Sequence, residues 1–466
     1  MAIAVHEVLG ALGHFETFCS VRALQELVEE VRRSSFRLTV ETAGRSSRGA
    51  PIHHLCCGDG EFKVLVVGFP HCHEPVGGMT VAALIRLLAQ RHHGLAAADL
   101  EWHIVPCIDP DGAILNEGWT QAPFSFERYM KNRHVQPWLN QVDCSFPISY
   151  KGLQFDRPSP EARILKQLLD AIRPDFFFSL HNSIAIGGIW YPISRDLGEH
   201  CHRDLADLRK QYDIPLQESI AHQRWCARYA AGIYEMFSVK RLYDDLERRV
   251  ASPAEFVKMG AASWDYLSEI HAEAVTFVAE LPHARYPDVA VTHRDESQRA
   301  LRLRLDAANK LLLAAILEEW QRVEHEVNGD SPHFQKVVNE IVSIGANLSE
   351  GVPLTLSAAS THDLQFNPMY SADYSQQELC DIYVGERFNV LCHAYEFVRL
   401  LKSSERTPAI VAAEARLERI FDEAFAEMSR AVSLERIPIL DCDTLVRVQL
   451  GSGLIALNAA LSSRAS

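Results

Sequence analysis

The stretch FKVLVVGFPHCHEPVGGMTVAALIRLLAQRH, residues 62–92, decides the fold class. It begins with a continuous, largely β-branched run at 62–69, which is typical of a strand buried on both faces. A polar turn follows, and apolar residues then recur with helical spacing over 76–92. A buried strand that leads through a short turn into a helix indicates an α/β layer.

The first three hundred residues continue this alternation. Residues 36–58 place a Gly/Ser turn between two apolar runs and are predicted to form a hairpin. A helix with Ser159 as N-cap is predicted to precede the third buried strand. The further buried strands are EWHIVPCI (101–108), FFFSL (176–180) and AVTFVAEL (274–281). We therefore expect an α/β fold with a mixed, mostly parallel sheet flanked by helices.

The strand signal disappears after about residue 296. Long amphipathic helices are predicted at 297–327, 376–401, 409–432 and 445–461. The cluster NGDSP (328–332) would interrupt them. We therefore predict an α/β domain of residues 1–326 and an all-helical C-terminal domain of residues 327–466.

Composition excludes several classes of partner. The chain has 61 acidic and 46 basic side chains, and this net charge of −15 argues against nucleic acid or an anionic membrane. We found no apolar run of the roughly 18 residues that span a bilayer. The 11 cysteines are scattered without a CxxC pair, and the N-terminal stretch lacks the basic segment of a signal peptide. We therefore expect a cytoplasmic protein.

The loop after the first buried strand carries candidate chemistry. His71, His73 and Glu74 lie within four residues at the carboxyl end of that strand, where open α/β sheets place ligands. A histidine and a glutamate separated by two residues in a turn can both reach one ion. A polar loop that happens to contain two histidines is the simpler alternative for this segment taken alone.

Two later strands end in the same way. His181 follows FFFSL, and Glu280 lies at the end of AVTFVAEL. Any one of these polar residues could be explained by packing or a solvated loop. Three buried strands with His or Glu at their carboxyl ends are hard to explain by packing, so the pattern favours a metal site in a cleft.

These residues, taken in order, resemble the zinc metallocarboxypeptidases of the carboxypeptidase A-like group. The resemblance covers roughly residues 30–325 and implies a hydrolase, a metallopeptidase that cleaves peptide bonds. Each motif is weak alone, but their order is specific. The supporting motifs are the hairpin 36–58 with its Gly-Arg turn, DPDG (109–112), the helix and strand before His181, and GAASWDYL (260–267).

The resemblance implies a role for each matching residue. His71, Glu74 and His181 would bind one zinc ion per chain, which makes hydroxide available near neutral pH. Glu280 would be the general base and would later return the proton to the leaving amine. Asp143, in a Val-Asp segment, would orient His71 through its other ring nitrogen.

The same resemblance suggests substrate contacts. Arg128, with Arg133 as the reserve choice, would stabilise the oxyanion, although a surface ion pair explains either arginine equally well. Trp264 lies where the family lines its specificity pocket and would fill much of it. His73 would face the substrate or solvent.

The sequence departs from the family at the residues that grip a substrate's terminal carboxylate. The family has Asn-Arg after Val-Asp-x, whereas this chain has Ser145 and Phe146, which cannot form the two parallel bonds of an arginine fork. Another arginine could replace it, with Arg195, Arg224 and Arg228 as candidates. Otherwise we expect an amidase-like enzyme that acts on a small or modified peptide or an N-acyl amino acid.

Two other functions stay open. The pair His71 and His73 also resembles the start of metal-dependent amidohydrolase barrels, which would need eight β/α units. The chain could alternatively be a non-catalytic binding protein on an inactive hydrolase fold. A small peptide or amide is the expected partner, and an oligomer formed through the C-terminal helices stays open.

Overall fold

The computed structural model describes residues 2–34, 37–92, 95, 99–182, 186–217, 225–257, 259–286, 298–328, 332–349 and 376–465. The chain forms two compact units. The first consists of Met1–Pro123, Trp138–His283 and Leu440–Ser466, and the second of Phe124–Pro137 and Ala284–Ile439.

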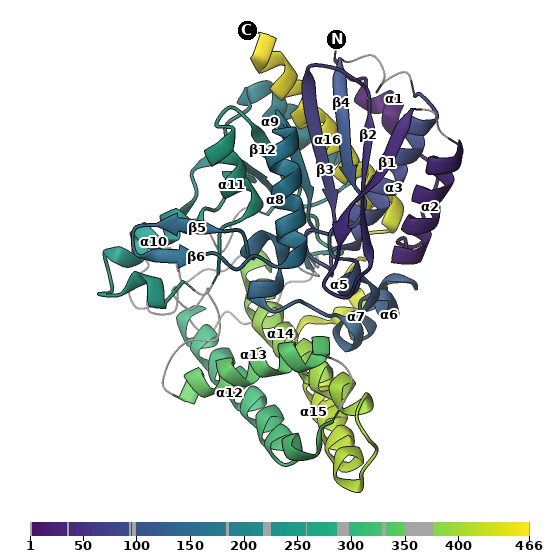
Figure 1. Cartoon of the computed structure of the whole chain (residues 1–466). Helices are drawn as coiled ribbons and strands as arrows, with labels where there is room; N and C mark the ends of the chain where they lie inside the picture. Colours follow the sequence, from purple (N-terminus) through teal and green to yellow (C-terminus); the bar gives the residue numbers. More distant parts are fainter. Residues whose placement is uncertain are drawn as a thin grey trace. The chain divides into compact units, whose positions relative to one another are not determined.

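A nine-stranded mixed sheet forms the centre of the first unit (Figure 1). Its order is β1-β2-β4-β3-β7-β12-β9-β11-β10, and β4, β3, β7 and β12 are parallel neighbours. The strands are β1 (Leu38–Arg45), β2 (Pro51–Cys57), β3 (Phe62–Gly68), β4 (Leu100–Val105), β7 (Phe176–Leu180), β9 (Tyr191–Ile193), β10 (Arg228–Ala230), β11 (Ile233–Glu235) and β12 (Val275–Phe277). The predicted mixed sheet and the hairpin of β1 and β2 are confirmed.

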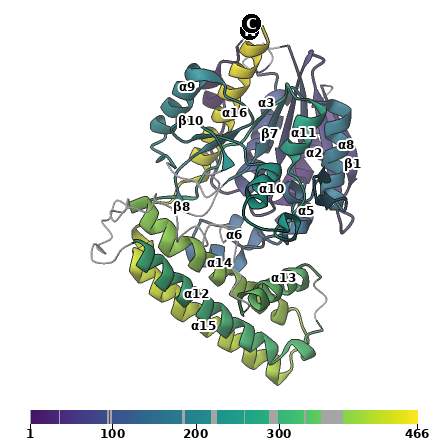
Figure 2. The same cartoon turned by 90° about the vertical axis from the view of Figure 1, so that its left-hand side faces the viewer.

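Helices flank this sheet (Figures 1 and 2). The helices α3 (Pro75–Ala89), α9 (Gly198–Gln211) and α16 (Cys442–Ala465) pack together, and α16 also contacts β7 and β12. The helix α8 (Pro160–Ile172) contacts β1 and α11 (Ser263–Ile270). Ser159 caps α8 as predicted, because its hydroxyl accepts from the backbone N–H of Ala162.

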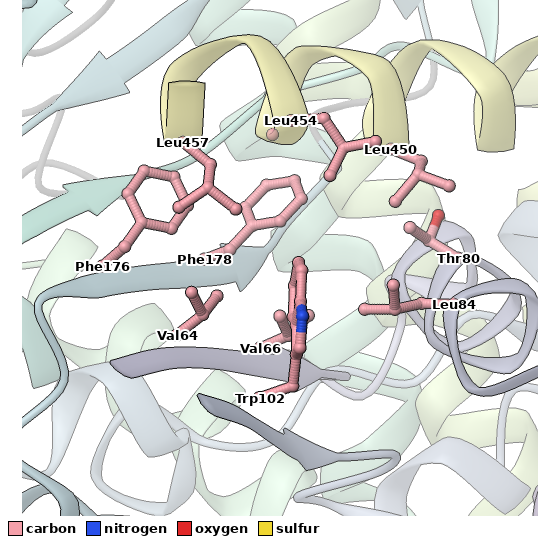
Figure 3. A pocket seen from close by; sticks show the side chains of 11 residues that line it. Val64, Val66, Thr80, Leu84, Trp102, Phe176, Phe178, Leu450, Leu454 and Leu457 are labelled. Atoms are coloured by element: carbon pink, nitrogen blue, oxygen red, sulfur yellow. The ribbon is translucent and has the colours of Figure 1, made fainter. Parts of the chain in front are cut away.

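The C-terminal helix α16 packs directly on the sheet. Leu454 and Leu457 lie over Phe176 and Phe178 of β7, and Leu450 lies over Thr80 and Leu84 of α3, around a small apolar cavity of about 10 Å³ (Figure 3). Among the described helices, α16 is the one that is long and apolar enough to cross a membrane, and 67% of its most apolar window is buried. In this structure it is a core helix.

The division of the chain therefore differs from the boundary that we predicted between residues 326 and 327. The second unit includes Phe124–Pro137 and resumes at Ala284, and α16 belongs to the first unit instead of the helical domain. The physical reason is that α16 is apolar around most of its circumference and needs burial on more than one side, which the sheet and two neighbouring helices provide.

The second unit is helical, as expected for the C-terminal region. Its helix α14 packs against the other four, and His134 and Glu396 form a buried ion pair inside the unit at 3.1 Å. The helices are α7 (Phe126–Asn132), α12 (Gln298–Gln321), α13 (Pro332–Ser349), α14 (Gln376–Lys402) and α15 (Pro408–Val432).

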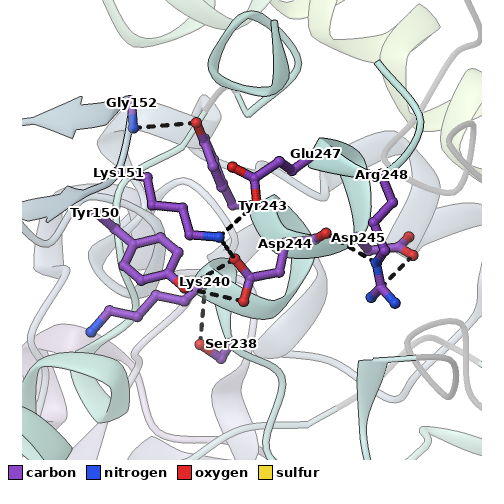
Figure 4. Close-up of polar contacts among 10 residues, drawn as sticks. All are labelled: Tyr150, Lys151, Gly152, Ser238, Lys240, Tyr243, Asp244, Asp245, Glu247 and Arg248. Atoms are coloured by element: carbon purple, nitrogen blue, oxygen red, sulfur yellow. Dashed lines mark hydrogen bonds and ion pairs between the residues drawn. The ribbon is translucent and has the colours of Figure 1, made fainter. Parts of the chain in front are cut away.

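The remaining elements of the first unit are short or peripheral. They are α1 (Val5–Gly10), α2 (Val21–Ser34), α5 (Pro110–Ile114), α6 (Glu117–Thr120), η1 (Trp138–Asn140), η2 (Val142–Cys144), β5 (Ile148–Tyr150), β6 (Leu153–Phe155), β8 (Ile186–Gly187), α10 (Val239–Glu247) and η4 (Pro253–Glu255). The turn between β5 and β6 is fastened to α10 by Lys151, whose Nζ lies 2.7 Å from both Asp244 and Glu247 (Figure 4). These ion pairs are half-exposed and screened by solvent, so each contributes little to stability.

Candidate metal centre

The loop between β3 and α3 brings two candidate ligands to the carboxyl edge of the sheet. The backbone N–H of Glu74 bonds to the carbonyl of His71 at 3.1 Å, which closes a turn. Glu74 is also the residue before α3, and Pro75 begins that helix. A Cβ on Gly77 would lie 2.6 Å from the Leu180 carbonyl oxygen, so this glycine allows the helix to approach the end of β7.

The third ligand reaches the same point from the neighbouring strand. The strands β3 and β7 are parallel, with Gly68 opposite Leu180, so the residues after them meet at one edge. His71, Glu74 and His181 each offer a donor atom, and these atoms lie within 4.8 Å of one another. Glu74 Oε2 is 3.0 Å from His181 Nδ1. The structure therefore brings together the three ligands predicted from the sequence.

The chemistry of this donor set fits zinc. Two imidazoles and one carboxylate are a common zinc combination, with a position left for water or substrate. The Nδ1 atom of His71 is buried and makes no hydrogen bond. Burial and the charge of His181 lower the pKa of His71 to about 3, so its imidazole is neutral and can donate a lone pair.

His181 is held between two carboxylates. Its Nε2 lies 3.1 Å from Asp143 Oδ2, opposite the nitrogen that faces Glu74. Burial alone would lower its pKa, but the charge of Glu74 and the hydrogen bond to Asp143 raise the pKa of His181 well above its ordinary value. The other oxygen of Asp143 accepts from the backbone N–H of Ser263 at 3.2 Å.

This arrangement corrects the predicted role of Asp143. We expected Asp143 to orient His71, but its hydrogen bond goes to His181. The reason is that η2, which carries Asp143, lies beside the end of β7, where the Ser179 hydroxyl also lies 3.0 Å from His181 Nε2. Asp143 acts on His71 only through its charge.

Glu280 lies close enough to the ligands to interact electrostatically with them. It follows β12 by three residues instead of ending a longer strand, and its backbone forms a bridge with Trp190. Burial raises the pKa of Glu280 to about 8, the charge of His181 opposes this, and repulsion from Glu74 adds to it. A cation bound to the three ligands would favour the ionised form.

Two predicted substrate contacts lie beside the ligands. The Trp264 ring is 6.2 Å from the His181 ring, edge to face, and its indole N–H donates to the Phe237 carbonyl. The ring of His73 is 5.9 Å from the ring of His71. His73 is not a member of the described three-residue donor group, so the geometry favours Glu74 over His73 as a ligand.

The arginines predicted to stabilise the oxyanion or to bind a carboxylate have other contacts or lie in other parts of the structure. Arg128 and Arg133 belong to the second unit, where Arg133 donates to Asn389 at 3.1 Å, and their predicted role in catalysis stays a prediction. Arg195 pairs with Glu273 at 3.4 Å, and Arg228 donates to the Ala230 carbonyl. Arg224 lies outside the described residues.

The sequence did not predict the support that α16 gives to His181. Gln449 is fully buried, and its Nε2 donates to the His181 carbonyl at 2.6 Å. Its Oε1 accepts from the Thr80 hydroxyl of α3 at 2.8 Å. A glutamine between apolar residues of the helix was the available signal, because a buried amide requires polar partners.

The family model for zinc carboxypeptidase matches residues 24–243. This stretch is similar to the zinc carboxypeptidase family. It contains His71, Glu74, Asp143 and His181 and ends before Trp264 and Glu280. No curated protein sequence matches the chain.

Solved metallocarboxypeptidases are also similar to the chain. The metallo-carboxypeptidase from Burkholderia cenocepacia is 16% identical with a TM-score of 0.31, over 57% of this chain and 60% of that protein. Carboxypeptidase A from Helicoverpa armigera is 17% identical with a TM-score of 0.36, over 57% of this chain and 65% of that enzyme. The chain thus covers less than two thirds of either protein, and likenesses at these scores carry no argument about its substrate.

Proposed function

We propose that the chain is a zinc-dependent hydrolase that cleaves an amide bond in a small or modified peptide or in an N-acyl amino acid. The similarity of the matched stretch to the zinc carboxypeptidase family supports a metal-dependent peptide hydrolase. The observation that carries the proposal is the convergence of His71, Glu74 and His181, with Glu280 electrostatically coupled to them.

The residues of the site divide the work of hydrolysis. Zinc, when bound, would polarise the scissile carbonyl and lower the pKa of a water molecule. Glu280 takes a proton from the attacking water and delivers it to the leaving nitrogen. Asp143 and Gln449 hold the ring and the backbone of His181, so that this ligand does not have to reorganise during the reaction.

The substrate class follows from two buried residues. Ser145 and Phe146, which stand in place of the family's Asn-Arg pair, are fully buried. The Ser145 hydroxyl lies 3.3 Å from that of Ser159, and the Phe146 backbone bridges to Ala261. Neither side chain can bind a free carboxylate, so a substrate with a blocked or absent C-terminal carboxylate fits better than an ordinary peptide. An N-acyl amino acid keeps its carboxylate and would need another arginine to bind it.

Two matched substrate sets test this proposal. The zinc-loaded chain would be assayed on C-terminally amidated dipeptides and amides of N-acyl amino acids, and on the same compounds with free carboxylates. We expect hydrolysis of the compounds with a blocked carboxylate and little release from ordinary peptides. Efficient release of C-terminal residues from unmodified peptides would contradict the proposed substrate class but not the zinc chemistry.

A further inference from the structure

A second cluster of metal-binding side chains lies on the sheet itself, on strands β2 and β4. Cys56, Glu101 and His103 each offer a donor atom, and these atoms lie within 4.8 Å of one another. Cys56 and His103 are direct cross-strand partners. Glu101 lies two residues before His103 on the same face, because side chains of a strand alternate between faces. The three strand positions are therefore fixed by the register of the sheet.

Two distances in this cluster fit the spacing of ligands in a tetrahedral site. Glu101 Oε1 is 3.7 Å from Cys56 Sγ and 3.2 Å from His103 Nε2. Bonds of about 2.3 Å to sulfur and about 2.0–2.2 Å to nitrogen and oxygen place neighbouring ligands of a zinc ion at such separations. A thiolate, an imidazole and a carboxylate form a donor set that favours zinc or cobalt over calcium or magnesium.

The free nitrogen of His103 is the observation that points to a ligand. His103 is only 6% exposed, and its Nε2 is buried and makes no hydrogen bond. Glu101 lies within ion-pair distance of this nitrogen, but without the alignment of a hydrogen bond. A cation bound between this nitrogen and the carboxylate oxygen would satisfy both groups.

A relay of hydrogen bonds orients His103 for this role. His103 Nδ1 lies 3.0 Å from His54 Nε2, and His54 Nδ1 lies 2.7 Å from Glu41 Oε1. The carboxylate of Glu41 can only accept, so His54 donates to it and in turn accepts from His103. When both imidazole rings are neutral, this direction of the hydrogen bonds leaves the lone pair of His103 on Nε2. Metal-bound histidines are commonly supported in this way through their other ring nitrogen.

The charge and exposure of the cluster suit a cation. Glu41 and Glu101 carry two negative charges, and Lys63 is the positive residue opposite Glu101 on β3. The side chain of Glu101 is 25% exposed, and Cys56 is partly exposed, so an ion can enter from solvent. A water molecule can occupy a fourth position beside the three protein ligands.

We propose that Cys56, Glu101 and His103 form a second binding site for zinc, distinct from the site at His71, Glu74 and His181. The site joins β2 to β4, so the ion stabilises the part of the sheet that leads to the β1–β2 hairpin. On binding, the Cys56 thiol forms the sulfur–metal bond and releases its proton to solvent. The proposal does not depend on the hydrolase function, because the two sites share no residue.

Metal analysis of the purified full chain with matched variants tests the proposal. We expect two zinc ions per wild-type chain and one in Cys56→Ser, with the first site still loaded. Cys57→Ser is the control, because Cys57 is adjacent but lies on the other face of β2. His54→Gln should weaken the second zinc by about 10–100-fold, because it breaks the relay without removing a ligand.

Cobalt identifies the ligands directly. With Co²⁺ as the probe, the wild-type chain and Cys57→Ser should show a thiolate-to-cobalt charge-transfer band in the near ultraviolet, and Cys56→Ser should lack it. A wild-type chain that binds one zinc ion, or a cobalt spectrum that is unchanged in Cys56→Ser, would overturn the proposal. A wild-type chain that binds two zinc ions but hydrolyses none of the substrates would count against the proposed function. The proposal of a second zinc site would still stand.

Discussion

Gln449 of α16 donates a hydrogen bond to the main-chain carbonyl of His181 across 2.6 Å, more than 260 residues away in the chain. The C-terminal helix thus positions a candidate metal ligand of the α/β unit. Gln449→Leu should remove this bond and leave both the His181 carbonyl and the Thr80 hydroxyl unpaired in a buried place. We expect the free energy of unfolding to fall by about 1–3 kcal/mol for each unpaired group. We also expect weaker zinc binding.

Asn458→Leu is the matched control for that prediction. Asn458 lies on the same helix and forms two hydrogen bonds with the backbone of Ile3, far along α16 from His181. Urea denaturation should show that both variants are destabilised, whereas zinc titration should separate them. Equal zinc affinity in Gln449→Leu and the wild type would show that α16 supports only the fold.

Asp143→Asn should weaken zinc binding at the first site. The carboxylate of Asp143 fixes the ring of His181 through Nε2, and removal of such a partner commonly costs about 10–100-fold in metal affinity. Competition with a chelator measures the change. Asp265→Asn is a suitable control, since Asp265 is also buried but accepts from the backbone of Val239 instead of from a ligand. Identical affinities in the two variants would exclude the support that we assign to Asp143.

Glu280→Gln should lower kcat by about 10²–10⁴-fold and retain zinc. The amide keeps the size of the side chain but cannot accept the proton from water. Because burial raises the pKa of Glu280 to about 8, the amide also resembles the neutral form that the metal-free site favours, so folding should be unaffected. Steady-state kinetics with zinc analysis checks this prediction, and full activity would assign the base to another residue.

The unfolding free energy should fall in acid because of His283. Its ring lies against Phe18 and Trp119 and receives a hydrogen bond from Asn182, and burial lowers its pKa from 6.5 to about 3. The unfolded chain therefore binds a proton below pH 6.5 that the folded chain does not. This contribution to stability is complete above pH 6.5 and is lost as the pH falls from 6.5 towards 3, by about 1.4 kcal/mol per pH unit.

The pH dependence of His283→Gln checks this assignment. Chemical denaturation between pH 7 and pH 4 should give a shallower decrease in the variant than in the wild type. Parallel curves would mean that His283 is not the residue that couples protonation to unfolding.

Gly453→Ala should destabilise the packing of α16 on the sheet. A Cβ at Gly453 would lie 2.1 Å from Cε1 of Phe178, so the helix or the ring must move, at a cost of about 1–3 kcal/mol. Gly13→Ala is the control, because a Cβ there meets nothing within 4 Å. Thermal unfolding gives the melting temperatures of the two variants. Equal melting temperatures would show that the contact with Phe178 relaxes without loss of stability.

The sequence was sufficient for the parts of the fold that depend on local patterns. Buried runs such as 62–68 and 176–180 predicted central strands, and the polar residues that follow them predicted His71 and His181 at one edge. These inferences succeed because the carboxyl ends of parallel strands must meet.

The remaining features depend on tertiary packing that the sequence does not encode locally. The apolar α16 has the same pattern whether it lies in a separate helical domain or against the sheet, so Gln449 could not be assigned to His181. Asp143 is far from both histidines in sequence, and only the position of η2 shows which one it contacts. The cluster of Cys56 and His103 requires the register of β2 and β4, which a single sequence does not specify.

An anomalous difference map at the zinc absorption edge, from crystals grown with zinc, tests the central claim most directly. We expect a peak bonded to Nδ1 of His71, to the Glu74 carboxylate and to Nδ1 of His181, with Asp143 still on the far side of His181. No peak at these residues, or a peak between His71 and His73 with Glu74 uncoordinated, would contradict it.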